Sequence, residues 1–187
     1  MVVKELARYN RLQFYKINRP LDTVRYTNVA TSVGTLVIAA CREGICYMGF
    51  EITASGIPVM EEIRVLWPSV TCVEDSDVAT LLVPSDGILR IALQGTPFRL
   101  QVWQALVDIP LGSIWSYSRL AAHIGRPSAV RAVASAVAAN PVSVLLPCHR
   151  VVRNNGDPGE YHWGRSLKKA ILVVEGAIAA DTGVLCF

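Results

Sequence analysis

The segment Pro141-Val-Ser-Val-Leu-Leu-Pro147-Cys148-His149-Arg150 places a thiol and an imidazole side by side, directly after a short apolar run between two prolines. The run is rich in β-branched residues, which predicts a buried extended segment. A free thiol has a pKa of about 8.5, and a nearby imidazole that accepts its proton makes it a nucleophile. Cys148 is therefore a candidate nucleophile and His149 its candidate base. The residues alone leave open the alternative of a buried cysteine beside a surface histidine.

A base of this kind needs an acceptor that orients the imidazole, and Glu175 is the best candidate. A final amphipathic helix that ends at Gly176 is predicted by the apolar positions Leu167, Ala170, Ile171 and Val174. Glu175 lies in the last turn, where the helix dipole disfavours a carboxylate, and its neighbours one turn back are apolar. An acid placed against both preferences suggests a role.

Upstream of the Cys-His pair, the sequence pattern predicts three short helices. Thr96-Pro97 is a favourable helix start, and Pro110 ends that helix. Its apolar face comprises Phe98, Val102, Ala105, Leu106 and Ile109. Ser116 can cap a helix over 117–124 that stops at Gly125, and Ser128 can cap another that runs to about Ala139. Two short helices around a glycine-containing turn form a helix-turn-helix candidate.

The second helix of this pair has two different faces. Its expected buried stripe is Val130, Val133, Ala134 and Val137, whereas Ser128, Arg131, Ser135 and Ala139 face outward. The outward face is small and carries a single cation. A helix that lies close against DNA needs small side chains, from which one long cation can project into the duplex. An ordinary alanine-rich helix with one solvated arginine is the open alternative.

The first half of the chain predicts a small α/β unit. Residues 34–40 and 45–50 read as a hairpin, 59–66 as a helix and 88–93 as a further strand. No residue pattern in this half indicates a catalytic or binding site, and the sequence pattern changes near Gly95. We expect an N-terminal scaffold domain over 1–94 and a C-terminal domain over 95–187 that carries the site.

Composition limits the classes of protein. The chain has 187 residues, of which 52% are hydrophobic and 18% charged, so a packed core is expected. From Gly95 onward there are 9 Lys and Arg against 5 Asp and Glu, which suits a polyanion-binding face. No apolar run is long enough to span a membrane, and the N-terminus does not resemble a secretory signal. We expect a soluble intracellular protein, cytoplasmic in a bacterium or nuclear in a eukaryote.

The five cysteines are Cys41, Cys46, Cys72, Cys148 and Cys186. An odd number in a chain without an export signal favours reduced thiols. Cys41 and Cys46 have a spacing found in zinc sites, but no second ligand pair follows. We interpret them as core cysteines on strands and expect no metal and no cofactor.

The stretch from Thr96 to Gly176 resembles the O6-alkylguanine-DNA alkyltransferases, closest to the bacterial Ada C-terminal and Ogt type. The resemblance rests on Phe98, residues 101–106, Ile109-Pro110, Gly112, Ser116-Tyr117, residues 129–133, Asn140, residues 147–152, Tyr161, Trp163-Gly164, Lys168 and Glu175-Gly176. It implies an α/β fold with a ribonuclease H-like N-terminal domain and a mainly helical, winged-helix-like C-terminal domain.

The resemblance also implies roles for individual residues. Cys148 would attack the O6-alkyl carbon, His149 would relay its proton through a water, and Glu175 would orient His149. Tyr117 would hydrogen-bond the guanine edge. Arg131 would fill the gap left by the flipped nucleotide.

Around these residues, Ser128, Ala132 and Ser135 would contact DNA, and Asn140 with Pro147 would shape the active-site turn. The alkyl pocket would be lined by Val137, Pro158, Tyr161, His162, Trp163 and Lys168. Trp163 suggests a crowded pocket that favours methyl groups. His162 takes a position that is Arg in the nearest relatives, and Asp157 and Glu160 put two acids on the adjoining loop.

The implied partner is double-stranded DNA carrying O6-alkylguanine, with O4-alkylthymine left open, and the protein would act as a monomer. Two other functions remain open. One is a lesion-binding protein or transcription regulator without transfer, although proteins of that kind replace the cysteine. The other is a Cys-His hydrolase, for which the sequence signals no oxyanion hole.

Overall fold

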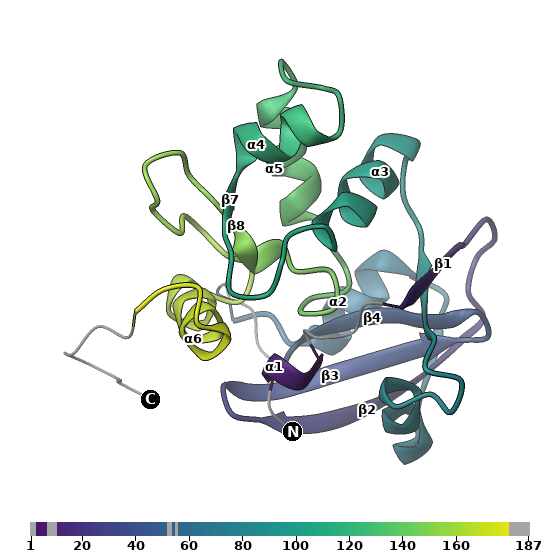
Figure 1. The fold of residues 1–187 in the computed structure, drawn as a ribbon. Helices are drawn as coiled ribbons and strands as arrows, with labels where there is room; N and C mark the ends of the chain where they lie inside the picture. The colour runs from purple at the N-terminus through teal and green to yellow at the C-terminus, as the bar shows by residue number, and fades with distance from the viewer. Residues whose placement is uncertain (1–2, 7–10, 52–53, 55, 180–187) are drawn as a thin grey trace.

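The computed structural model describes residues 3–6, 11–51, 54 and 56–179. A six-stranded sheet dominates the first half, with the order β1-β6-β4-β3-β2-β5. Its strands are β1 (Leu12–Lys16), β2 (Thr23–Thr31), β3 (Gly34–Cys41), β4 (Gly44–Phe50), β5 (Thr71–Glu74) and β6 (Leu89–Leu93). The short helix α1 (Val3–Leu6), the helix α2 (Val59–Leu66) and the 3₁₀ segment η1 (Ser76–Leu82) accompany the sheet (Figure 1).

The predicted hairpin, helix and strand of this half are confirmed. β3 and β4 pair antiparallel, and the helix has the bounds that its spacing and Pro68 predict. Cys41 and Cys46 lie on these two strands and are buried, as expected for core cysteines. The strands β1, β2 and β5 and the 3₁₀ segment η1 were not predicted from the sequence.

The second half is mainly helical. It contains α3 (Pro97–Leu106), β7 (Trp115–Ser116), α4 (Tyr117–His123), α5 (Val130–Ala138), the 3₁₀ turn η2 (Cys148–Arg150), β8 (Val151–Val152) and α6 (Arg165–Glu175). The hydroxyls of Thr96 and Ser116 cap α3 and α4, as predicted. The predicted cap at Ser128 is wrong, because α5 begins after Ala129 and no side chain caps it. No helix in the described ranges is long and apolar enough to cross a membrane.

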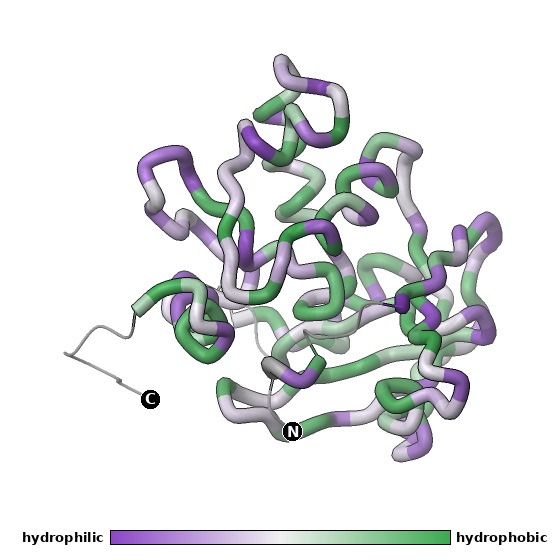
Figure 2. The backbone as a smooth tube through the Cα atoms, viewed as in Figure 1, coloured by the Kyte–Doolittle hydropathy of each residue, from purple (hydrophilic) through white to green (hydrophobic). Residues whose placement is uncertain are grey.

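Two apolar clusters form the core. The larger joins residues of β3, β4 and β6 to residues of α3, α4, α5 and the active-site segment, which is residues 141–148. The smaller lies between the strands and α2. Figure 2 shows the hydrophobic stretches running along the strands and through the interior of the helical half. The apolar packing is therefore continuous across Gly95, and the division into domains at that residue stays a prediction.

The active-site segment is attached to the sheet at Met48. The backbone N–H of Met48 donates to the carbonyl of Pro141 at 2.9 Å, and the N–H of Ser143 donates back to Met48 at 2.7 Å. The prediction of an extended run over 141–146 is wrong beyond Val142, the residue that pairs with Met48. The segment is buried but turns, and Val144 adopts a φ of 67°, a strained conformation for a β-branched residue.

Candidate active site

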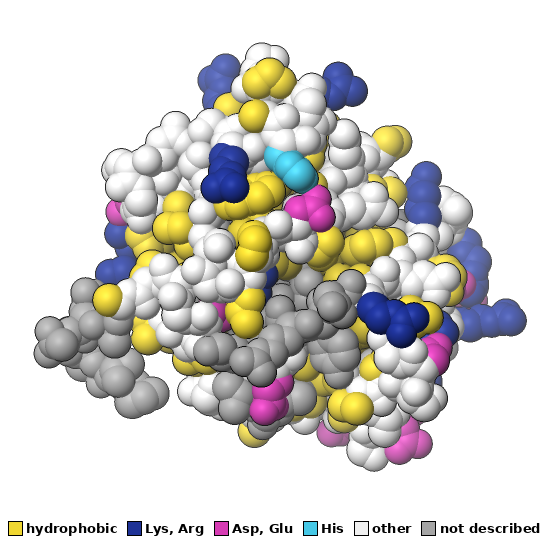
Figure 3. Space-filling view, in the orientation of Figure 1, with side chains coloured by type: hydrophobic (Ala, Val, Ile, Leu, Met, Phe, Trp, Pro, Cys, Tyr) yellow, Lys and Arg dark blue, Asp and Glu magenta, His cyan; other side chains and the backbone are white. Residues whose placement is uncertain are grey.

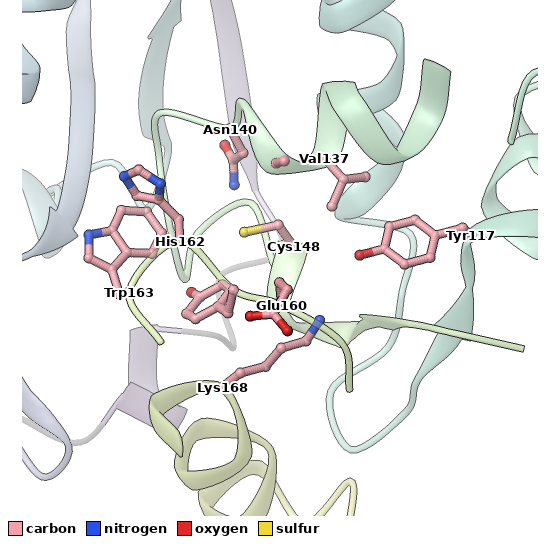
Figure 4. Close-up of a pocket in the computed structure, with 10 residues that line it drawn as sticks. Tyr117, Val137, Asn140, Cys148, Glu160, His162, Trp163 and Lys168 are labelled. Atoms are coloured by element: carbon pink, nitrogen blue, oxygen red, sulfur yellow. The ribbon is translucent and has the colours of Figure 1, made fainter. Parts of the chain in front are cut away.

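Cys148 begins η2 directly after Pro147 and is only 5% exposed. It lies at a cavity of about 240 Å³ between two walls. One wall comes from α4 and α5 (Tyr117, Val137, Ala138), and the other from the loop before α6 and from α6 itself (Glu160, Tyr161, His162, Trp163, Lys168). Figure 4 shows the sulfur between these walls, below Asn140. The structure thus places the predicted pocket residues around the thiol, apart from Pro158, which is not among the lining residues.

Asn140 holds the turn that carries Cys148. Its side-chain amide donates to the carbonyls of Leu146 at 2.8 Å and Val142 at 3.3 Å, and its side-chain oxygen accepts from the N–H of Val142 at 3.0 Å. All three contacts are buried. They satisfy backbone groups that a tightly turned, buried segment cannot pair within itself. Asn140 therefore stabilises the conformation of residues 142–146 that precedes the nucleophile.

His149 and Arg150 both contact the carboxylate of Glu175, at the end of α6. Nε2 of His149 lies 3.0 Å from Oε1, while Nε and a terminal nitrogen of Arg150 donate to Oε2 and Oε1 at 2.8 and 3.0 Å. The other terminal nitrogen of Arg150 donates to the carbonyl of Ile109 at 2.6 Å. The side chains of His149 and Glu175 are completely buried. The charge of Glu175 is thus balanced inside the protein by a bidentate arginine.

These contacts define which nitrogen of His149 can accept a proton. Burial raises the pKa of Glu175, but the hydrogen bonds from His149 and Arg150 outweigh it and lower this pKa to about 2. Burial lowers the pKa of His149, so the imidazole is neutral at neutral pH. An ionised carboxylate only accepts, so Nε2 carries the proton and donates it to Glu175. Nδ1 is then a bare acceptor, and it is buried without a hydrogen-bond partner among the described residues.

Cys148 itself rests as a thiol. Burial raises its pKa, although Asn140, the Lys168 charge and Tyr161 act in the opposite direction. Lys168 lies on the buried face of α6, and its ammonium donates to the carbonyls of Val151 and Pro158, each at 2.6 Å. Burial lowers the pKa of Lys168 to about 8, so it still carries most of its charge at neutral pH. The thiol therefore needs both a proton acceptor and this nearby cation to ionise.

Two tyrosines of the cavity differ in their contacts. The Tyr161 hydroxyl lies 2.9 Å from the hydroxyl of Ser143 in a buried pair, and burial raises the pKa of Tyr161 well above its usual value. Burial also raises the pKa of Tyr117, which keeps its O–H protonated. Figure 4 shows the Tyr117 hydroxyl directed toward the cavity from the wall opposite Trp163. Tyr117 is thus a neutral hydrogen-bond donor at the cavity.

The predicted DNA-binding residues share an exposed surface at α5. Ser128, Arg131, Ala132 and Ser135 are exposed, whereas Val133, Ala136 and Val137 are buried. Ala136 thus takes the buried place that was predicted for Ala134. Residues 117–138 include Arg119, Arg126 and Arg131 and contain no Asp or Glu. Figure 3 shows Lys and Arg side chains projecting from the end of the molecule that α4 and α5 form.

Comparisons with known proteins point to one family. The family model described as "6-O-methylguanine DNA methyltransferase, DNA binding domain" matches residues 97–177. The methylated-DNA–protein-cysteine methyltransferase of Methanosarcina acetivorans is 32% identical over 155 residues, which cover 81% of this chain and 98% of that protein. The chain belongs to this methyltransferase family. The predicted resemblance is confirmed at the level of the family.

For other members of the methyltransferase family, the match spans a smaller share of the relative's length. The bifunctional transcriptional activator/DNA repair enzyme Ada of Escherichia coli is 37% identical over 159 residues, which are 80% of this chain and 44% of Ada. The Salmonella typhimurium methylated-DNA–protein-cysteine methyltransferase is 49% identical over 88 residues, 47% of this chain and 52% of that protein. The chain thus spans about half the length of the first curated relatives that it matches.

A solved structure supports the α/β fold class. The Mycobacterium tuberculosis O6-methylguanine methyltransferase has 28% sequence identity and a TM-score of 0.68, with coverage of 84% of this chain and 95% of that chain. A crystal structure of the M. tuberculosis protein in complex with DNA matches with a TM-score of 0.63.

The segment from Pro141 to Arg150 contains two residues for which the sequence suggested no role. Arg150 follows His149 directly, and its burial with Glu175 was not foreseen, although an arginine in an apolar stretch is a usable signal. Ser143 pairs with Tyr161, and no sequence pattern indicated this contact. The buried face of α6 also differs from the prediction: it contains Lys168, Ile171, Leu172 and Glu175. Two of these four are charged: Glu175 was singled out from its apolar surroundings and Lys168 through the resemblance, but the apolar pattern placed neither on the buried face. Cys186 lies outside the described residues.

Proposed function

We propose that this chain repairs O6-alkylguanine in DNA by transferring the alkyl group to Cys148. The observation that carries the proposal is the buried chain of contacts from Glu175 to His149, with its free Nδ1, beside a thiol at a cavity. Family membership supports the proposal, since relatives are named methylated-DNA–protein-cysteine methyltransferases. The presence of Cys148 favours transfer over lesion binding alone.

In the proposed reaction, Nδ1 of His149 receives the thiol proton through a water, and the sulfur of Cys148 attacks the alkyl carbon. A carbon–sulfur bond forms while the bond between that carbon and O6 breaks. Tyr117 donates a hydrogen bond to the base. The guanine leaves in its neutral form as it takes up one proton from water, while the proton held by His149 is released to water. The product is a thioether, which has no good leaving group, so each molecule reacts once.

The target carbon lies inside the stacked duplex, so the base must be flipped out to reach Cys148. Extrusion costs a few kcal/mol, and less for a poorly paired damaged base. We propose that α4 and α5 act as a helix-turn-helix whose small face at Ser128, Ala132 and Ser135 lies in the minor groove. Arg131 is the exposed long cation of that face and would fill the gap in the stack. The crystal structure of the M. tuberculosis protein in complex with DNA supports the binding of DNA, although not these individual roles.

The alkyl group preferred by this site is methyl. The rings of Trp163 and Tyr161 pack edge to face, with their centroids 5.3 Å apart, and close one side of the small cavity. This leaves little space for a larger group. A monomer suffices for the reaction, because all the residues assigned to it lie on one chain.

Stoichiometric repair of DNA tests the proposed function. A duplex with one O6-methylguanine inside a restriction site that the lesion blocks should become cleavable when the protein is added. The yield should rise linearly with protein and stop at one repaired site per molecule. Continued repair beyond that ratio, or no repair at any ratio, contradicts the proposed single transfer.

A further inference from the structure

One wall of the cavity is fastened to the first half of the chain through His162. Nε2 of His162 forms a hydrogen bond with Oε1 of Glu62, which lies on α2, one hundred residues earlier in the sequence. The carbonyl of His162 also accepts from the backbone N–H of Ala54 at 2.9 Å. His162 therefore has both its side chain and its backbone attached to the N-terminal half.

Glu62 is itself held in place by a buried tyrosine. Its Oε2 accepts a hydrogen bond from the hydroxyl of Tyr47 on β4 at 2.5 Å. Burial, together with Glu62, raises the pKa of Tyr47, so the hydroxyl keeps its proton. The side chain of Glu62 is 15% exposed, whereas that of its neighbour Glu61 is 57% exposed. Of these two adjacent acids of α2, Glu62 is the one that is built into the fold. We call Tyr47, Glu62 and His162 the clasp.

His162 of the clasp packs against Trp163. The ring of Trp163 meets the ring of His162 edge-on, with centroids 4.8 Å apart and planes at 90°. On the β4 side its ring packs edge to face against Phe50, with the centroids 6.1 Å apart. A Cβ added to Gly49 would lie 2.8 Å from the Trp163 ring. The indole thus has no free space toward the sheet. His162 confines it on a further side, so Trp163 can withdraw from the cavity only if His162 moves.

We propose that Glu62 determines the size of the group that reaches Cys148, because it holds His162 and thereby keeps Trp163 in the cavity wall. Glu62 is a positioning residue, since it does not line the cavity. The first half of the chain, in which the sequence suggested no chemistry, contributes this selectivity. For alkylguanine the inference rests on the proposed function, but the same wall restricts any reagent that alkylates Cys148.

Simple alkyl halides test the clasp without DNA. Methyl iodide and benzyl bromide each form a carbon–sulfur bond with the cysteine as the halide leaves and the thiol proton goes to the buffer. Mass spectrometry of the Cys148 peptide gives the rate for each reagent and separates it from the other cysteines. The ratio of the benzyl rate to the methyl rate cancels changes in the thiol's own reactivity. It therefore reports the width of the path to the sulfur.

In Glu62→Ala this ratio should rise about tenfold, because the loss of a hydrogen bond to a charged group releases His162. Glu62→Gln keeps one acceptor oxygen and should give a smaller rise. His162→Ala breaks the same contact but also removes a side chain that lines the cavity, so its ratio should rise at least as far as that of Glu62→Ala. Glu62→Gln is the second variant should Glu62→Ala fold poorly. Glu61→Ala is the matched control and should leave the ratio at the parental value.

Equal ratios in Glu62→Ala and Glu61→Ala would overturn the inference, whatever the ratio in His162→Ala. The outcome is separable from that of the proposed function. A parent protein that takes no methyl group from an O6-methylguanine duplex, while the halide ratio rises in Glu62→Ala, would contradict the repair function and support the clasp. A parent that repairs the duplex, with unchanged ratios in all variants, would support repair and overturn the clasp.

Discussion

His149 and Glu175 are joined through Nε2 and Oε1 at 3.0 Å, and this contact leaves Nδ1 as the only ring nitrogen that can accept a proton. The tautomer follows from the low pKa of Glu175, because an ionised carboxylate cannot donate. The basic nitrogen of His149 is thus assigned by a residue 26 positions later in the chain.

Glu175→Gln should slow transfer by roughly 100-fold, the lower end of what a general base contributes, since the amide no longer fixes the tautomer of His149. It should also lower the free energy of unfolding by about 3 kcal/mol, because Arg150 is left buried without its counter-charge. Single-turnover kinetics and urea denaturation measure the two effects.

Arg150→Gln serves as the control for that variant. It breaks the same ion pair but leaves the contact between His149 and Glu175 available. Transfer should then fall much less than in Glu175→Gln at a comparable loss of stability. Equal rates in Glu175→Gln and the parent would remove Glu175 from the mechanism.

Acid should destabilise the protein through Glu175. The pKa of this residue is lowered from 4.5 to about 2 in the folded state, so its stabilisation is fully present above the unfolded value and is lost as pH falls through the folded value. The difference in unfolding free energy between the parent and Glu175→Gln should therefore shrink by roughly 3 kcal/mol between about pH 5 and pH 2. A difference that stays constant over this range, measured by denaturant titration, argues against an ionised Glu175.

Lys168→Met should raise the pKa of Cys148, because the cation that favours the thiolate is removed. The rate of Cys148 alkylation by iodoacetamide, followed against pH, should shift to higher pH and fall about tenfold at neutral pH. Lys169→Met, the neighbouring lysine, is the matched control and should keep the parental profile. An unshifted profile in Lys168→Met would show that its charge does not reach the thiol.

Arg131→Ala should weaken repair of a duplex by about tenfold or more while reaction with free O6-methylguanine base changes little. The reason is that the arginine acts on the duplex during extrusion of the base. Arg126→Ala changes another exposed arginine near α5 and should have a smaller effect. Equal losses on both substrates in Arg131→Ala contradict the role of Arg131 in flipping.

The local signals of the sequence predicted much of this molecule. Hydroxyl caps at Thr96 and Ser116, the stop at Gly176 and the hairpin around residues 42–43 all act over a few residues, and the structure bears them out. The Cys-His pair and Glu175 were also found from the residues, because an acid in an apolar last turn violates local preferences.

The features that sequence patterns missed depend on long-range contacts. Residues 141–146 look like a strand, but only Val142 pairs, since Asn140 holds the following residues in turns. The helix α6 buries Lys168, whose ammonium donates to the carbonyls of Val151 and Pro158, and the buried contact of Glu175 with Arg150 was not expected. Glu62 and His162 are one hundred residues apart, and neither has neighbours that mark it. Each case requires a partner that periodicity does not contain.

Intact-protein mass spectrometry shows whether Cys148 receives the alkyl group. The protein is mixed with an equimolar duplex that carries one O6-methylguanine, and Cys148→Ala is treated in parallel. We expect the parent to gain the mass of one methyl group at Cys148, in step with loss of the lesion, and Cys148→Ala to gain nothing. An unchanged parental mass with the duplex still bound, or a methyl group on another cysteine, would contradict transfer to Cys148.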